Sequence, residues 1–333
     1  MPEGFTLTLL AVLGLAIAFD YINGFHDTAN AIATSVATRA LRPGWAIAMS
    51  AVANFAGALT GLEVARTVGS GLIDTRVESQ TVIAAALVGA IIWNLITWRL
   101  GIPSSSSHAL IGGLLGAALI SAGIGAWQVD TIVSRVLLPL VASPIIGFTI
   151  GLLLMVLIFN VFRRAHPARL NGVFRRLQVV SAAWMAFSHG SNDAQKTMGI
   201  MTLALLNAGV ITTFEVPLWV IITAATAISL GTAAGGWRII KTMGSRVVKL
   251  DPVHGFAAET TAATVIFTAS QFGMPVSTTH VISSAIMGVG SSDRFRTVRW
   301  GVARSIVTAW VLTLPASAFA AAIAYLVLRP ILG

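Results

Sequence analysis

Long apolar stretches recur along the whole chain and are separated by short polar segments. The main stretches lie at residues 7–19, 44–62, 81–98, 109–126, 136–162, 177–188, 197–211, 216–234, 255–273, 278–290 and 305–328. Several of them approach the roughly 20 residues that a helix needs to cross the hydrocarbon core of a bilayer. The pattern therefore predicts an all-α polytopic membrane protein, embedded in a lipid bilayer.

Composition supports this prediction. The chain has 333 residues, of which 56% are hydrophobic and only 10% are charged, whereas a soluble domain carries roughly 25% charged residues. Cysteine is absent, so the chain has neither a disulfide framework nor a thiolate metal site.

The net charge of +9 does not indicate a nucleic-acid partner, because the basic residues are confined to particular loops. Segments near 39–42, 99, 163–176, 238–249 and 294–304 hold 16 of the 21 Lys and Arg residues. With about ten spans and both termini outside, all of these segments face the cytoplasm, as the positive-inside rule requires. The distribution of basic residues therefore indicates the membrane topology of the chain.

Two motifs occur twice, in the same order. GFHDTANAI (24–32) matches GSNDAQKTM (190–198) at a shift of 166 residues, and GIPSSSSHALIGGLLG (101–116) matches GMPVSTTHVISSAIMG (273–288) at a shift of 172. An internal duplication explains this better than chance.

Five spans in each half would insert the two copies with opposite orientation. Inverted repeats with irregular or Gly/Pro-interrupted segments at matching places are typical of secondary transporters. The predicted organisation is a first transmembrane repeat at 1–162, a cytoplasmic linker at 163–176 and a second, inverted repeat at 177–333, with broken helices or re-entrant segments.

The first doubled motif places polar side chains where an apolar helix should simply continue. Asn23, Asp27 and Asn30 follow one another at i, i+4 and i+7, so they share one helix face, and Asp20 lies three residues earlier. Gly24 could let the backbone open here and leave a half-helix whose N–H groups point at a ligand.

The corresponding region of the second copy contains five matching residues: His189, Gly190, Asn192, Asp193 and Lys196. A carboxylate at the middle of the membrane costs about 2.5–3.5 kcal/mol even on the lowest scale. Doubled acids therefore indicate a functional site, and the alternative is that Asp193 and Lys196 form a purely structural pair at i, i+3.

The second doubled motif is PSSSSH in the first copy and PVSTTH in the second. Each Pro should stop a helix, and the residues after it supply hydroxyls and free N–H groups at the start of the next helix, which suits an anion. The candidate ligands here are Ser105, Ser106, Ser107, Ser277, Thr278 and Thr279. Ordinary N-capping is the alternative, and His108 and His280 are expected to orient the loops rather than to bind a metal.

Together these segments predict a mixed site for an oxyanion and a cation. The candidates for substrate binding are Asp27, Asn30, Asn192, Asp193, Lys196 and the six hydroxyl residues of the second motif. The candidates for cation coupling are Asn23, His26, Asp27, Asp193 and Glu259, and a Na⁺ ion would use Asp27, Asp193, Ser105 and Ser277. Glu259 has no acidic counterpart in the first half, and it could instead merely hydrogen-bond to the neighbouring Thr residues.

Energetics favour coupled transport of such an anion. Moving a dianion into an inside-negative cell costs a free energy of about 2.3 kcal/mol per charge per 100 mV, so import requires co-transported cations. No cofactor is expected besides co-transported H⁺ or Na⁺. A protonated phosphate oxygen can donate a hydrogen bond to Asp27 or Asp193, which sulfate cannot, and this favours phosphate.

The quoted motifs resemble the two signature repeats of the inorganic phosphate transporter (PiT) family, over residues 19 to about 290, and are most similar to those of its bacterial low-affinity phosphate permeases. The resemblance implies an inverted-repeat fold in the bacterial plasma membrane and import of inorganic phosphate driven by H⁺ or Na⁺, with a neutral metal–phosphate complex as another form of the substrate. It carries over Asp27, Asn30 and Asp193 as ligands.

The chain departs from the common family pattern at Phe25, His26 and Lys196. A fixed positive charge at Lys196 could replace one coupling cation, and His26 could carry a proton near neutral pH, so we expect H⁺ coupling rather than Na⁺ coupling. A sulfate permease of the same fold and an anion channel remain alternatives. An enzyme is not expected, because no G-x-S-x-G elbow and no H-E-x-x-H zinc motif occurs. The sequence leaves open whether the chain forms a homo-oligomer.

Overall fold

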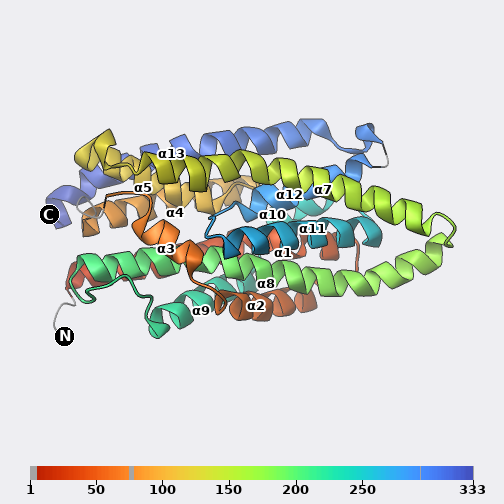
Figure 1. The fold of residues 1–333 in the computed structure, drawn as a ribbon, viewed down its shortest axis with the longest axis horizontal. Coiled ribbons are helices and arrows are strands. Elements are labelled where there is room, and N and C mark those ends of the chain that lie inside the picture. The colour runs from red at the N-terminus through yellow and green to blue at the C-terminus, as the bar shows by residue number, and fades with distance from the viewer. Residues whose placement is uncertain (1–5, 75–78, 293, 333) are drawn as a thin grey trace.

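The computed structural model describes residues 6–74, 79–292 and 294–332, and these residues confirm the predicted all-α membrane architecture. The helices run along one long axis (Figure 1). The first half contains α1 (Leu7–Ala37), α2 (Pro43–Ala58), α3 (Glu63–Ser70), α4 (Gln80–Leu100), α5 (Ser106–Ala122), the short α6 (Val129–Thr131) and α7 (Leu138–Phe162). The second half contains α8 (Pro167–Asn207), α9 (Leu218–Ala234), α10 (Trp237–Lys241), α11 (Pro252–Gln271), α12 (Thr278–Ser291) and α13 (Trp300–Leu332).

Within the described ranges, four helical segments are long and apolar enough to cross a membrane: α1, α4, Val129–Phe162 and α13. Two bent pairs raise this number to six if each pair is one span: α2 with α3, bent by 73°, and α9 with the segment Trp237–Arg246, bent by 61°. α8 and α11 carry many of the buried polar residues. The start of α1 and the end of α13 lie at the same end of the molecule, opposite the turn that joins α7 to α8 (Figure 1). Both termini therefore lie on one side, and which side of the membrane this is stays a prediction.

The helix order of the first half returns in the second, and the two halves exchange partners. α1 packs against α9, and its counterpart α8 packs against α2; likewise α5 packs against α13, and α12 against α7. The bent pairs α2–α3 and α9–α10 occupy matching places. Such reciprocal packing is expected of two related, interlocked halves, as the doubled motifs predict.

One prediction about the backbone is wrong. α1 continues as one helix through Gly24, and α8 continues through Gly190, so neither motif opens into a half-helix. A Cβ at Gly24 would stand 2.2 Å from the carbonyl oxygen of Ile228, and one at Gly190 would stand 2.1 Å from that of Asn54. These glycines are needed for close helix crossings, α1 with α9 and α8 with α2. The segment 163–176, predicted as a cytoplasmic linker, is helical from Pro167, where α8 begins, and its place relative to the membrane stays a prediction.

The backbone is instead interrupted at the second doubled motif. α4 ends at Gly101 with φ of 67°, and α11 is followed by Gly273 with φ of 65°. Only glycine adopts this left-handed conformation without strain. Short segments without regular structure, each containing a Pro, then lead into α5 and α12, so the predicted helix stops at Pro103 and Pro275 are confirmed.

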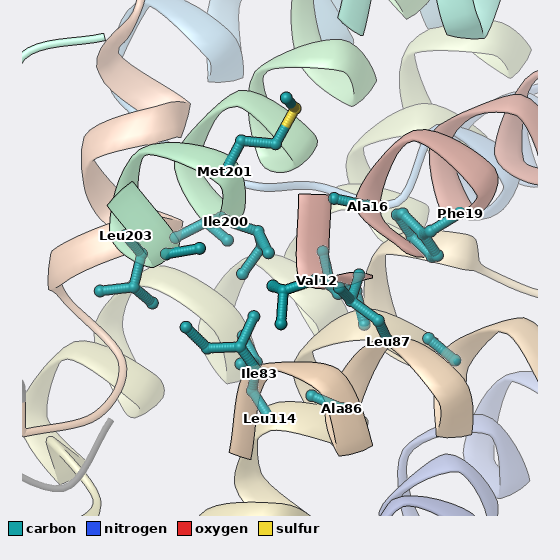
Figure 2. Packing of buried hydrophobic residues seen from close by; sticks show 14 of the residues in the cluster. Val12, Ala16, Phe19, Ile83, Ala86, Leu87, Leu114, Ile200, Met201 and Leu203 are labelled. Atoms are coloured by element: carbon teal, nitrogen blue, oxygen red, sulfur yellow. The ribbon is translucent and has the colours of Figure 1, made fainter. Parts of the chain in front are cut away.

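Two apolar clusters enclose the polar residues. Figure 2 shows part of the first cluster, in which side chains of α1, α4, α5 and α8 interdigitate, among them Val12, Phe19, Leu87 and Met201. The second cluster takes residues 29–33 of α1 together with parts of α8, α11 and α12. Along α1 the clusters leave residues 20–28 between them, and this gap holds the predicted site residues Asn23, His26 and Asp27.

Candidate functional site

The doubled motifs meet in the centre of the molecule. α1 and α8 pack against each other, and both contact the segments that begin α5 and α12. The two motif acids are almost entirely buried, with Asp27 2% exposed and Asp193 fully buried, as is Lys196 at 1%. Charges buried to this degree are retained in proteins only where they are paired or bind a ligand.

The first-half acid, Asp27, is held by residues of its own half. His26 Nδ1 lies 2.6 Å from Asp27 Oδ1, and the Ser106 hydroxyl donates to Asp27 Oδ2 at 3.2 Å. His26 Nε2 lies 3.1 Å from the hydroxyl oxygen of Thr97, which in turn accepts a hydrogen bond from Ser104. The imidazole therefore connects the carboxylate to the end of α4 and the loop before α5.

The second-half acid, Asp193, is paired with an ammonium group. Lys196 Nζ donates to Asp193 Oδ1, to the Ser107 hydroxyl at 2.5 Å and to the Val276 carbonyl at 3.3 Å. His189 Nε2 lies 3.0 Å from Asp193 Oδ2. The pair of Asp193 and Lys196 at i, i+3 thus exists. Lys196 also contacts the segments that begin α5 and α12, and a purely structural pair does not need these contacts.

Asn30 and Lys196 occupy equivalent positions in the repeat, and each crosses to the other half. The Asn30 amide donates to Thr278 at 3.2 Å and Thr279 at 2.9 Å, at the start of α12, while Lys196 donates to Ser107 at the start of α5. Thr278 then donates to Asp193 Oδ2 at 3.1 Å. All four polar segments predicted from the sequence therefore form one hydrogen-bonded cluster.

Two of the expected hydroxyl ligands are helix caps. Ser105 accepts from the His108 N–H and Ser277 accepts from the His280 N–H, each at 3.2 Å. This is the ordinary N-capping that the sequence offered as the alternative. The rings of His108 and His280 lie 4.8 Å apart, and His280 stacks on Trp310 at 4.0 Å.

Three other expected residues stand apart from the two acids. Asn192 donates to Ser270 at 2.8 Å and so ties α8 to the end of α11. Asn23 is buried one turn before Asp27, and its side-chain oxygen has no hydrogen-bond partner in the described part of the chain.

Glu259, the third residue, lies in a separate buried group. It accepts from Thr34 and Ser181, both at 2.5 Å, and from Gln178 at 3.1 Å. These partners come from α1 and α8, and not from the Thr residues next to Glu259 in sequence, which were one of the two alternatives left open by the sequence.

The cluster offers places for both a cation and an anion. Ligand atoms of Asp27, His189 and Asp193 lie within 4.8 Å of one another. Carboxylate oxygens suit hard cations, whereas Lys196, Asn30 and the N-termini of α5 and α12 supply donors for an oxyanion.

The candidate ligands predicted from the sequence omit several contributors. His189 belongs to the second copy of the motif and stands four residues before Asp193, which puts both side chains on one helix face. Gln195 accepts from the Val64 N–H at 2.9 Å and donates to the Thr60 carbonyl at 3.2 Å, so it fixes the start of α3. Thr97 carried no signal, because a lone Thr in an apolar helix is unremarkable.

Comparison with known proteins gives concordant matches. A sequence model of the Phosphate transporter family matches residues 23–171 and 162–321. A "Probable low-affinity inorganic phosphate transporter" of Bacillus subtilis is 50% identical over 328 residues, which cover 98% of each chain. A protein of the same description from Rhizobium meliloti is 50% identical over 321 residues, 95% of each chain.

A solved structure described as "The sodium-dependent phosphate transporter" superimposes with a TM-score of 0.86. It is 24% identical and the match covers 98% of this chain and 100% of that one, which supports the fold. The sequence matches identify the family, whose members are transporters and not enzymes. The chain belongs to the phosphate transporter family.

Proposed function

We propose that this chain imports inorganic phosphate across the plasma membrane by symport with protons. The observation that carries the proposal is the reciprocal crossing of Asn30 and Lys196, which ties the starts of α12 and α5 to α1 and α8 beside the buried acids Asp193 and Asp27. The names of the relatives at 50% identity support phosphate as the substrate.

Phosphate has the chemistry that such a cluster would recognise. Its oxygens accept hydrogen bonds from the hydroxyls and N–H groups at the starts of α5 and α12. Its remaining proton can be donated to the carboxylate of Asp27 or Asp193, and sulfate has no such proton at neutral pH. A site that depends on this donor rejects an analogue that lacks it, because a buried acceptor is left unpaired.

The contacts of Lys196 favour protons over sodium as the coupling ion. Its Nζ is surrounded by oxygens of Asp193, Ser107 and Val276, the kind of shell that would otherwise hold a metal cation. The Lys196 ammonium is covalently attached, so it neutralises Asp193 permanently and is not transported with the substrate. It therefore cannot couple phosphate import to an ion gradient. The mobile charge must then be carried elsewhere, and the His26–Asp27 pair, 2.6 Å apart, is suited to a proton.

A neutral metal–phosphate complex is the second form of substrate that the site could accept. Asp27, His189 and Asp193 bring ligand atoms together, and a divalent metal between them and a phosphate would cancel the charge of the dianion. This form would need fewer protons per phosphate than the free anion.

Uptake of radiolabelled phosphate into proteoliposomes tests the proposal, with a pH gradient or a Na⁺ gradient imposed separately. We expect accumulation driven by pH alone, little competition by sulfate, and loss of accumulation in Asp27→Asn and Asp193→Asn. Asp130→Asn, an exposed acid, is the matched control. Transport of sulfate without phosphate would overturn the substrate, and accumulation driven only by Na⁺ would overturn the coupling ion.

A further inference from the structure

A second buried acid on α1 lies outside the central cluster. Asp20 is fully buried, and neither of its carboxylate oxygens has a hydrogen-bond partner in the part of the chain that the structure describes. It precedes Asp27 by seven residues, or about 10 Å along the helix. An isolated carboxylate in such a place is strongly disfavoured as an ion.

Two oxygen-bearing side chains stand beside Asp20. They are Asn23 on the next turn of α1 and Thr197 on α8. The Asn23 side-chain oxygen and the Thr197 hydroxyl are themselves buried, and neither has a hydrogen-bond partner among the described residues. Both side chains act on Asp20 as donors, through the Asn23 amide and the Thr197 hydroxyl, without reaching hydrogen-bond geometry.

The charged groups that act on Asp20 come from one neighbouring helix. They are Asp193 and Lys196 on α8. Helices α2 and α9, which also pack against α1, carry no ionisable residue. Helix α4 carries only Arg99, which lies beyond the contact of α4 with His26. Further away, α5 and α12 bring His108 and His280, α10 brings Arg238 and Lys241, and α11 brings His254 and Glu259.

The surroundings on the other side are apolar. Phe19 precedes Asp20 in sequence and belongs, with Val12, Ala16 and Leu87, to the cluster shown in Figure 2. Asp20 therefore lies at the boundary between this apolar cluster and the polar centre. The cluster separates it from the end of the molecule where α1 begins.

A proton satisfies this arrangement better than a metal ion. The protonated carboxyl could donate its hydrogen to the Thr197 hydroxyl oxygen, while its carbonyl oxygen accepts from the Asn23 amide. A metal ion would find oxygens from only three side chains here and would be repelled by the ammonium of Lys196.

We propose that Asp20 binds a proton that is transported together with phosphate. The carboxylate takes this proton from water when the site is open to one side of the membrane and releases it to water on the other side, so only one O–H bond forms and breaks. This inference rests on the proposed function, to which it adds a coupling residue outside the substrate cluster.

The test is the number of protons that enter with each phosphate, measured in proteoliposomes with a trapped pH dye and labelled phosphate while the membrane potential is held at zero. We expect Asp20→Asn to lower this ratio by one and to reduce accumulation driven by a pH gradient at least tenfold. Phosphate exchange at equal pH should fall much less, because exchange needs no net proton release. Asp20→Glu should keep the parental ratio, and the exposed Asp130→Asn is the matched control.

An unchanged proton ratio in Asp20→Asn would overturn the inference and leave the proposed function standing. If Asp20→Asn cannot be purified as folded protein, the Thr197→Val variant tests the inference instead. Loss of the hydroxyl should shift the pH dependence of phosphate uptake without changing phosphate exchange at saturating phosphate. An unchanged pH dependence in Thr197→Val would count against the inference. A parent protein that accumulates no phosphate would refute the proposed function itself.

Discussion

The crossing of α1 and α9 at Gly24 makes a quantitative prediction about the site. In Gly24→Ala the new Cβ would meet the Ile228 carbonyl oxygen at 2.2 Å, the Thr232 nitrogen at 2.9 Å and the Gly231 Cα at 3.0 Å. All three are backbone atoms, so no side-chain rotation can relieve the clash. The helices must move apart instead.

The required movement sets the size of the effect. An ordinary contact of this kind is about 3.5 Å, so the backbones must separate by more than ~1 Å at the crossing. Overpacking that the surroundings cannot absorb costs about 1–3 kcal/mol, and unyielding backbone on both sides places this change at the upper end. We expect Tm in detergent to fall by roughly 5–10 °C.

Transport should suffer more than stability. Gly24 lies within one turn of Asn23, His26 and Asp27, so a displacement of α1 moves these side chains relative to α8. A misplacement of ~1 Å in a binding constellation can cost about 100-fold in rate. Phosphate uptake by Gly24→Ala should therefore be nearly abolished even in protein that is folded at the assay temperature.

The same helix provides the control. A Cβ at Gly14 would meet nothing within 4 Å, and Ala is a better helix former than Gly by about 1 kcal/mol. Gly14→Ala should therefore melt at or above the parental Tm and transport normally. If Gly24→Ala melts and transports like Gly14→Ala, the close crossing does not position the site and the reasoning is refuted.

Three further changes test particular contacts. Lys196→Met leaves Asp193 as an uncompensated buried charge and should destabilise the protein by about 3–5 kcal/mol; adding Asp193→Asn should restore thermal stability but not uptake. Asn30→Ala removes two hydrogen bonds to the start of α12, each worth about 1 kcal/mol net, so Tm should fall by a few degrees and KM for phosphate in uptake assays should rise severalfold; an unchanged KM would exclude Asn30 from binding. Thr34→Val removes one of the hydroxyl donors of Glu259 and should lower stability by about 1–3 kcal/mol, measured by thermal unfolding; the absence of an effect would show that this carboxyl does not depend on the bond.

Helical periodicity places positions 20, 23, 27 and 30 on one face of α1. All four side chains are buried, but so is every residue from His26 to Ser35, so burial alone does not single out this face. The doubled motifs predicted that a second set of residues would complete the site, and the contacts of Asn30 with Thr278 and Thr279 join segments 248 and 249 residues apart.

Other properties of the site were not predictable from local pattern. Gly24 suggested a broken helix, whereas its function is set by the carbonyl of Ile228 on another helix. Among neighbouring hydroxyls with the same chemistry, Ser105 caps α5 and Ser106 contacts Asp27. This difference depends on the angle at which α5 meets α1, which no motif specifies.

The sequence by itself determined the membrane environment, the helical class and the doubled polar motifs, because hydropathy and residue order are local properties. Tertiary structure decided which donor meets which acid. Lys196 binds Asp193 three residues away, but it reaches Ser107 across 89 residues, and Glu259 takes its partners from α1 and α8. Such contacts depend on how interlocked helices cross, and crossings are fixed by backbone contact at small residues, where Gly24 meets α9 and Gly190 meets α2.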